Sequence, residues 1–81
     1  MLMARDGRAE TMPMFLISVT HRNTEARYFM RNTVWTSDGL RATQFPTREA
    51  AQAHFDKWIA GPFTKPRVFK QTYSPIEIID A

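Results

Sequence analysis

The chain contains no cysteine among its 81 residues. It can therefore form no disulfide, use no thiol nucleophile, and hold no iron–sulfur cluster or cysteine-based zinc site. Long apolar segments are also absent. The longest such run, 12–19, is interrupted by Pro13 and Ser18, and it is far shorter than the ~20 residues that cross a bilayer. Because no apolar segment follows a basic start in the manner of a signal peptide, we expect a cytoplasmic protein with no membrane partner.

Residue patterns that carry catalysis are sparse. The two histidines, His21 and His54, stand in no His-x-x-x-His or Glu-x-x-His spacing that would hold a metal. We interpret His54 as flanking a helix and His21 as flanking a turn. The serines lack a nucleophile elbow, the carboxylates form no acid–base pair, and the glycines are too dispersed to cradle phosphate. We expect no enzymatic activity, no catalytic residue, no metal site and no cofactor.

What the chain does contain suits one small domain. Hydrophobic residues make up 43% and aromatic residues 12%, and 11 Lys and Arg against 8 Asp and Glu give a net charge of +3. We expect a mobile N-terminal arm over 1–13, which lacks helical or strand periodicity, and a single domain over 14–81. Met12 and Met14 are alternative translation starts. The two arginines of the arm are offset by its two carboxylates, so the net charge belongs to the folded part.

Alternation of apolar and polar residues predicts a sheet. The expected strands cover 14–21, 26–35, 40–45 and 67–73. Polar residues 22–25 join the first two strands as a hairpin, and a Ser-Asp-Gly turn at 37–39 precedes the third. Pro75 interrupts the fourth strand because proline donates no backbone hydrogen bond. The extended residues 76–79 then either continue that strand or form an edge strand of their own.

A helix is predicted between the third and fourth strands, over 47–60. Thr47 can cap its start, Glu49 places a negative charge in the first turn, and Gly61 follows the last turn. The apolar stripe of this helix consists of Ala51, Phe55, Trp58 and Ile59. One helix lying on one face of an antiparallel sheet makes a two-layer structure. The predicted fold is therefore α+β, with three to four strands and one helix in the order β-β-β-α-β.

The second expected strand alternates arginine with aromatic residues. The residues that share one of its faces are Arg27, Phe29, Arg31, Thr33 and Trp35. Arginine and aromatic side chains are good interface anchors because they bury much surface and keep a polar group. We therefore predict a partner-binding surface here. The residues assigned to it are Arg27, Phe29, Arg31 and Trp35, with Arg41 and Arg48 nearby.

The sequence is compatible with several binding partners for this surface. One helix covers only one sheet face, and the sequence does not say which, so the other face presents apolar residues rimmed by arginine. Such a surface suits a partner protein or a second copy of the chain in a homodimer. The same residues could instead bind nucleic acid by backbone contacts and stacking. A third reading places Arg27 and Arg31 over Phe29 on a solvated face.

The run from Ala42 to Ala51, ATQFPTREAA, resembles the A-x-x-F-x-T/S-x-E-A strand-to-helix junction of many small, uncharacterised proteins encoded by phages and prophages. The resemblance extends over 14–81, with an initial hairpin, a Trp-Thr-Ser-Asp turn at 35–38, and an apolar–acidic ending at 76–80. It implies a phage-type accessory protein in the host cytoplasm, of the general build of some small anti-CRISPR proteins. No catalytic residue comes with the pattern.

The resemblance and the predicted surface together lead to one expectation about function. The protein is expected to bind a host or defence protein complex through its surface and thereby modulate or inhibit that complex. The alternative is a nucleic-acid-binding module that uses the basic and aromatic strand face.

Overall fold

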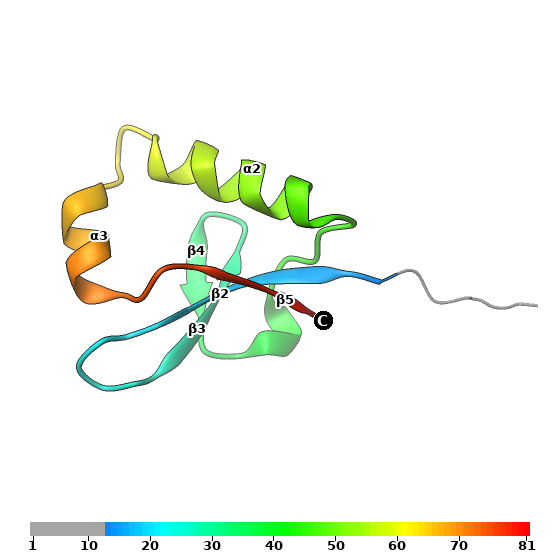
Figure 1. Ribbon diagram of the computed structural model, residues 1–81, viewed down its shortest axis with the longest axis horizontal. Coiled ribbons are helices and arrows are strands. Elements are labelled where there is room, and N and C mark those ends of the chain that lie inside the picture. The colour runs from blue at the N-terminus through cyan, green and yellow to red at the C-terminus, as the bar shows by residue number, and fades with distance from the viewer. Residues whose placement is uncertain (1–12) are drawn as a thin grey trace, which may run out of the picture.

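The computed structural model describes residues 13–81. Its strands are β2 (Phe15–Thr20), β3 (Arg27–Arg31), β4 (Val34–Thr36) and β5 (Glu77–Asp80), and its helices are η1 (Gly39–Arg41, a 3₁₀ helix), α2 (Arg48–Ile59) and α3 (Pro66–Thr72) (Figure 1). Apart from Pro13, the arm expected over 1–13 lies outside the described residues. Within residues 13–81, no helix has both the length and the apolar character to cross a membrane.

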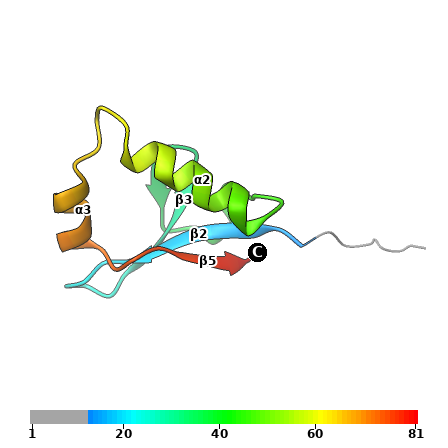
Figure 2. The same cartoon turned by 45° about the horizontal axis from the view of Figure 1, so that its top comes forward.

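The strands form one four-stranded antiparallel sheet in the order β4-β3-β2-β5. Helix α2 crosses one face of this sheet, and α3 stands at the end of the molecule where β2 turns into β3 (Figures 1 and 2). The expected α+β class with an antiparallel sheet is therefore confirmed. The order β-β-β-α-β holds except that a second helix, α3, precedes the last strand.

The core lies between α2 and the sheet. Its fully buried members are Ile17 of β2, Met30 of β3 and Ala51 of α2, joined by Phe45 from the segment before the helix. Because strand side chains alternate between faces, Leu16, Ser18 and Thr20 of β2 lie on the side opposite to Ile17. This alternation settles which face α2 covers.

The helix start is as the sequence predicts. The Thr47 hydroxyl accepts a hydrogen bond from the Ala50 N–H at 3.0 Å, and Glu49 lies in the first turn. Helix α2 runs to Ile59, one residue short of the expected end. Its predicted stripe faces the core: Ala51 is fully buried, and Phe55 and Trp58 pack against the buried cluster.

The expected single strand over 26–35 is wrong, because it is two strands joined by a two-residue turn. Asn32 adopts a φ of 55°, in the left-handed region that asparagine tolerates better than most residues. The turn is fastened to α2 at both of its carbonyls. His54 Nε2 lies 2.7 Å from the Asn32 carbonyl oxygen, and Trp58 Nε1 donates to the Thr33 carbonyl at 3.0 Å.

The third strand expected over 40–45 is also wrong. Residues 39–41 form η1, whose start is capped by the Asp38 carboxylate accepting from the Leu40 N–H at 2.9 Å. Only Phe45 makes a strand-like contact, an isolated antiparallel bridge to Phe15. The third strand of the sheet is instead the short β4.

The fourth strand expected over 67–73 is a helix, α3. Pro66 occupies its first turn, where its fixed φ and missing N–H cost nothing. Phe69 and Tyr73 are four residues apart, so a helix brings both rings to one side, where both stack on Trp35. The extended segment expected over 76–79 is confirmed as the edge strand β5.

Candidate interaction surfaces

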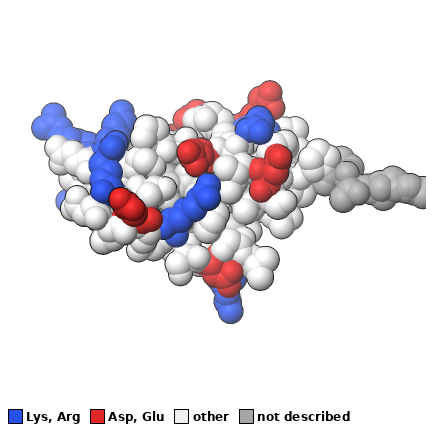
Figure 3. Space-filling view, turned by 60° about the horizontal axis from the view of Figure 1, so that its bottom comes forward, with Lys and Arg blue, Asp and Glu red and all other residues white. Residues whose placement is uncertain are grey.

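The sheet side opposite α2 is here called the helix-free face. Strand pairing places on it Leu16, Ser18, Thr20, Arg27, Phe29, Arg31, Val34, Thr36, Glu77 and Ile79. Three of the predicted site residues, Arg27, Phe29 and Arg31, therefore do share one face. In a view of this side, basic and acidic side chains are interspersed among uncharged atoms (Figure 3).

Arg27 lies across the helix-free face and links three strands. Its Nε donates to the Ser18 hydroxyl at 2.9 Å, and its Nη2 lies 3.2 Å from a Glu77 carboxylate oxygen. The guanidinium also sits 5.8 Å from the centre of the Phe29 ring. Ser18 is almost fully buried beneath these groups. Arg27 thus contacts β2, β5 and the Phe29 ring at once.

Arg31 differs from Arg27 because it has no ion-pair partner among the residues that the structure describes. Among residues 13–81, three ion pairs form, and Arg31 belongs to none of them. Its cross-strand partner Val34 is 59% exposed. Leu16 and Ile79, paired across β2 and β5, continue this row on the same face. Within this row Val34 is the exposed apolar residue, whereas Leu16 is buried and Ile79 is half-buried.

Arg41 lies beside this face on η1. Its Nε is 3.4 Å from the Asp38 carboxylate, and both side chains are largely exposed. The segment packs close to the sheet at Gly39, where an added Cβ would sit 3.4 Å from the Phe29 ring. Residues 38–41 thus cover part of the helix-free face, which is less open than a single-helix fold predicts.

Trp35 does not join this surface. It pairs with Met30, so it faces α2 and contacts the rings of Trp58, Phe69 and Tyr73 at centroid distances of 5.8, 5.7 and 6.4 Å. The placement beside Arg31 assumed one continuous strand. The turn at 32–33 instead reverses the chain, and the cross-strand partner then determines the face.

Arg48 also lies apart from the other predicted site residues, and it contacts Phe15 and the backbone of β5. Its guanidinium lies 4.9 Å from the centre of the Phe15 ring, and Nη1 donates to the Ile78 carbonyl at 2.7 Å. Asp80 lies 4.0 Å from the same guanidinium. Because β5 is an edge strand, Arg48 occupies backbone acceptor positions that another strand would otherwise pair with. It joins the start of α2 to β5.

A stronger concentration of charge lies at the other end of the molecule. We call it the basic end: Arg22, Lys65, Arg67 and Lys70, all exposed. Arg22 belongs to it because its Nε donates to the Lys70 carbonyl at 3.0 Å. Basic side chains gather at this end of the space-filling view (Figure 3). The signal in the sequence is that no Asp or Glu occurs anywhere between 57 and 76.

Two open grooves flank α2, each of about 660 Å³. One lies between α2, α3 and the segment before β5, with Phe55, Phe69 and Tyr73 in its wall and Arg22 and Lys70 at its rim. The other lies where the end of α2 meets the β3–β4 turn. Its lining residues are Asn32, Thr33, His54, Lys57, Trp58, Gly61, Pro62, Phe63 and Thr64.

The histidines have structural contacts. His21 Nδ1 accepts hydrogen bonds from the Asn23 and Thr24 N–H groups in the β2–β3 turn, as a turn-flanking residue would. His54 holds the β3–β4 turn and packs against Phe45. Within residues 13–81, no three His, Cys, Asp or Glu side chains gather in a way that could hold a metal ion.

Comparison of the chain with protein-family models, with curated proteins and with solved structures finds no match.

Proposed function

We propose that this protein is a small accessory binding protein that attaches to a host or defence protein complex and modulates or inhibits that complex by occupying its surface. The observation that carries the proposal is the row on the helix-free face where Arg31, free of any ion pair among residues 13–81, lies beside exposed Val34.

The neighbouring residues support a docking role for this row. Arg27 already contacts Ser18, Glu77 and the Phe29 ring, so part of its side-chain freedom is lost before a partner covers it. Interfaces pay free energy for ordering side chains, and a pre-ordered surface reduces that cost. The pairing of Arg31 with exposed Val34 places a cation beside an apolar side chain, and arginine next to apolar surface is a combination that protein interfaces favour.

The chemistry of the row also indicates which kind of partner surface it would bind. Arg31 and Arg41 favour carboxylate groups, which guanidinium binds through two parallel hydrogen bonds. Exposed Val34, paired with Arg31 across β3 and β4, favours an apolar side chain next to those carboxylates. The expected contact on the partner is thus an acidic patch that contains one or two exposed apolar residues.

The test is affinity capture from a bacterial lysate, with a matched pair of double variants. Arg31→Glu/Val34→Asp changes the helix-free face. Arg67→Glu/Val68→Asp makes the same chemical changes on α3, where Val68 is 53% exposed. All four residues are exposed, so both variants should melt within a few degrees of the unmodified protein. We expect a protein captured by the unmodified chain to be absent from the capture with Arg31→Glu/Val34→Asp and present in the capture with Arg67→Glu/Val68→Asp.

Two results would contradict the proposal. Recovery of the same proteins by the unmodified chain and by Arg31→Glu/Val34→Asp would show that the helix-free face is not the contact. Light scattering provides the second check, because a dimer that dissociates in Arg31→Glu/Val34→Asp but persists in Arg67→Glu/Val68→Asp would assign the face to a second copy of the chain instead of a different protein.

A further inference from the structure

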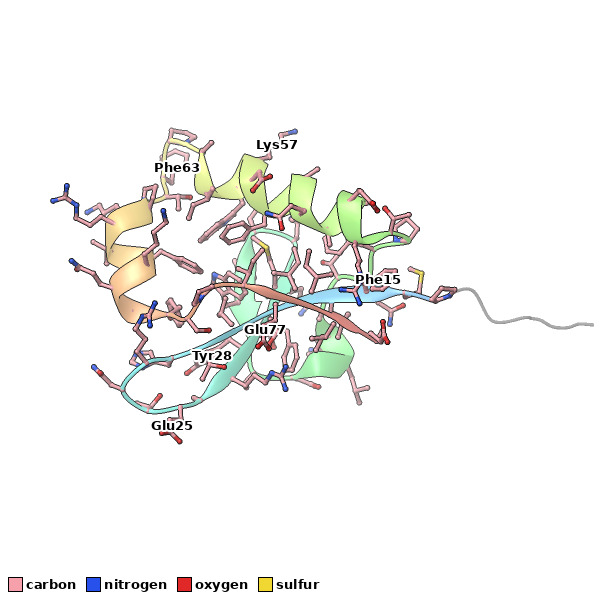
Figure 4. All side chains as sticks on the ribbon, in the orientation of Figure 1. Phe15, Glu25, Tyr28, Lys57, Phe63 and Glu77 are labelled. Carbon is pink, nitrogen blue, oxygen red and sulfur yellow. The ribbon has the colours of Figure 1, made fainter. Side chains whose placement is uncertain are left out.

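Phe63 presents an aromatic ring to solvent. It is 98% exposed, in the loop between α2 and α3. Figure 4 shows Phe63 and Lys57 directed away from the sheet, on the outer side of the helices. A ring left fully in water contributes nothing to the core, so its whole face is available for stacking.

The surroundings of Phe63 are basic throughout. Lys57 lines the same groove as Phe63, and Lys65 and Arg67 follow within four residues. On α3, Arg67 and Lys70 are three residues apart and therefore lie on one side of the helix. The nearest carboxylates along the chain are Asp56 and Glu77, and Glu77 is paired with Arg27 on the helix-free face. Glu25 follows Arg22 by three residues in the chain and lies at the tip of the β2–β3 hairpin (Figure 4).

The groove beside Phe63 offers both stacking surface and hydrogen-bonding groups. Its volume is about 660 Å³, and the rings of Trp58 and Phe63 line it. Asn32 and Thr33 bring the polar groups of the β3–β4 turn to its opposite wall. A flat, partly polar ligand fits such a groove, and repeated negative charge fits the cations that continue along α3.

We propose that this surface binds single-stranded nucleic acid. One base stacks on Phe63 in the groove, and the phosphates that follow lie along Lys65, Arg67 and Lys70, with Arg22 at the far end. A cationic track joined to an exposed aromatic ring is the combination that single-strand binders use, because every base has a face to stack and every nucleotide has a phosphate. The surface is separate from the helix-free face and independent of the function proposed for that face.

The salt dependence of affinity follows from the number of phosphates contacted. Binding of single strands weakens with salt at a log–log slope of about −0.7 per phosphate, so contact with about four phosphates predicts a roughly fifty-fold loss of affinity between about 50 and 200 mM salt. Removing two of the four cations should reduce that loss to roughly seven-fold.

Fluorescence anisotropy with a labelled oligo-dT of about 15 nucleotides, a length that spans the usual single-strand site, tests the proposal. Arg67→Gln/Lys70→Gln removes two charges from the basic end, and Arg31→Gln/Arg41→Gln removes two from the other side of the molecule, which leaves both variants with the same net charge. We expect weaker binding and a shallower salt dependence from the first variant only. Phe63→Ala should weaken binding by about five-fold or more without changing the salt slope.

Three results would overturn the proposal. The first is no binding at the lowest salt concentration. The second is equal weakening by the two charge variants, since that would mean the oligonucleotide responds only to net charge. The third is unchanged affinity of Phe63→Ala together with equal affinity for a duplex of the same length, because a stacking platform would then have no part in binding.

Discussion

Replacing Trp35 with alanine tests whether this residue lies in the core or on the surface. The indole ring stacks on Phe69 and Tyr73 and meets the edge of Trp58, all within 6.4 Å between ring centres. These rings come from both helices, so Trp35 is the point at which α2, α3 and the sheet are held together. Had the ring been on the helix-free face, its removal would scarcely affect stability.

The expected loss can be worked out from these contacts. Truncating a core tryptophan to alanine costs about 3–5 kcal/mol, from lost burial and the cavity left behind. One feature offsets part of that cost: Trp35 Nε1 is buried with no hydrogen-bond partner among residues 13–81, and deleting an unpaired buried donor removes an unfavourable contribution. We therefore expect about 3–4 kcal/mol. A domain of this size is stable by roughly 4–10 kcal/mol, so the variant should retain little stability.

The assay is equilibrium unfolding in urea, followed by far-ultraviolet circular dichroism so that loss of the indole does not affect the signal. Val34→Ala is the matched control, because Val34 is the preceding residue, is 59% exposed and faces the opposite side. Its unfolding free energy should change by less than about 0.5 kcal/mol. If Trp35→Ala and Val34→Ala unfold at the same urea concentration, Trp35 is not in the core and the β3–β4 turn is wrongly assigned.

Four further predictions concern local features. Thr47→Ala should cost about 1 kcal/mol in urea unfolding, through loss of the α2 cap. Asn32→Val should cost about 1–2 kcal/mol, because a β-branched residue resists the left-handed φ, whereas Asn32→Gly should be nearly neutral; equal costs would contradict the turn. A double-mutant cycle on Arg27 and Glu77 should give a coupling under about 1 kcal/mol, as both side chains are about half-exposed or more. Amide hydrogen exchange should be faster in α3 than in α2, since a seven-residue helix depends wholly on its packing.

Local sequence signals were sufficient to predict those elements whose structure is determined by residues close by in the chain. The start of α2 is an example: Thr47 caps the helix with its own side chain, and Glu49 acts on the first turn, so both effects operate within a few residues. The first strand is another, because β2 places Phe15, Ile17 and Val19 on one face and pairs with strands on both sides. The fold class follows from these two elements and was predictable.

Elements that depend on distant residues were not predictable in the same way. Residues 67–73 have a pattern short enough to suit either a strand or a helix. They fold as α3 because Phe69 and Tyr73 find Trp35, which lies more than thirty positions earlier in the chain. The turn at 32–33 lacks glycine and proline, the residues that usually mark a turn. Two carbonyls of this turn are instead held by His54 and Trp58.

The same division applies to the candidate surfaces. Strand alternation correctly grouped Arg27, Phe29 and Arg31, since all three precede the turn. It failed for Trp35, because a reversal of the chain changes the face that every later residue occupies. The basic end was visible in the sequence as an acid-free stretch, but a strand would have spread its cations over two faces. Only a helix places Arg67 and Lys70 on one side.

The fold separates the arginine residues from most of the aromatic residues with which they alternate in sequence. Trp35, Phe55, Trp58, Phe69 and Tyr73 turn inward and make one ring cluster, whereas Phe63 stays exposed outside it. Of the charges left outside, those near the sheet are largely matched: Arg27, Arg41 and Arg48 each have a carboxylate within 4.0 Å. The net charge of +3 is therefore expressed chiefly where carboxylates are missing, at α3 and the loop before it. The overall charge is mild, but one end of the molecule is strongly basic. Elsewhere among the described residues, most of the cations are neutralised by ion pairs.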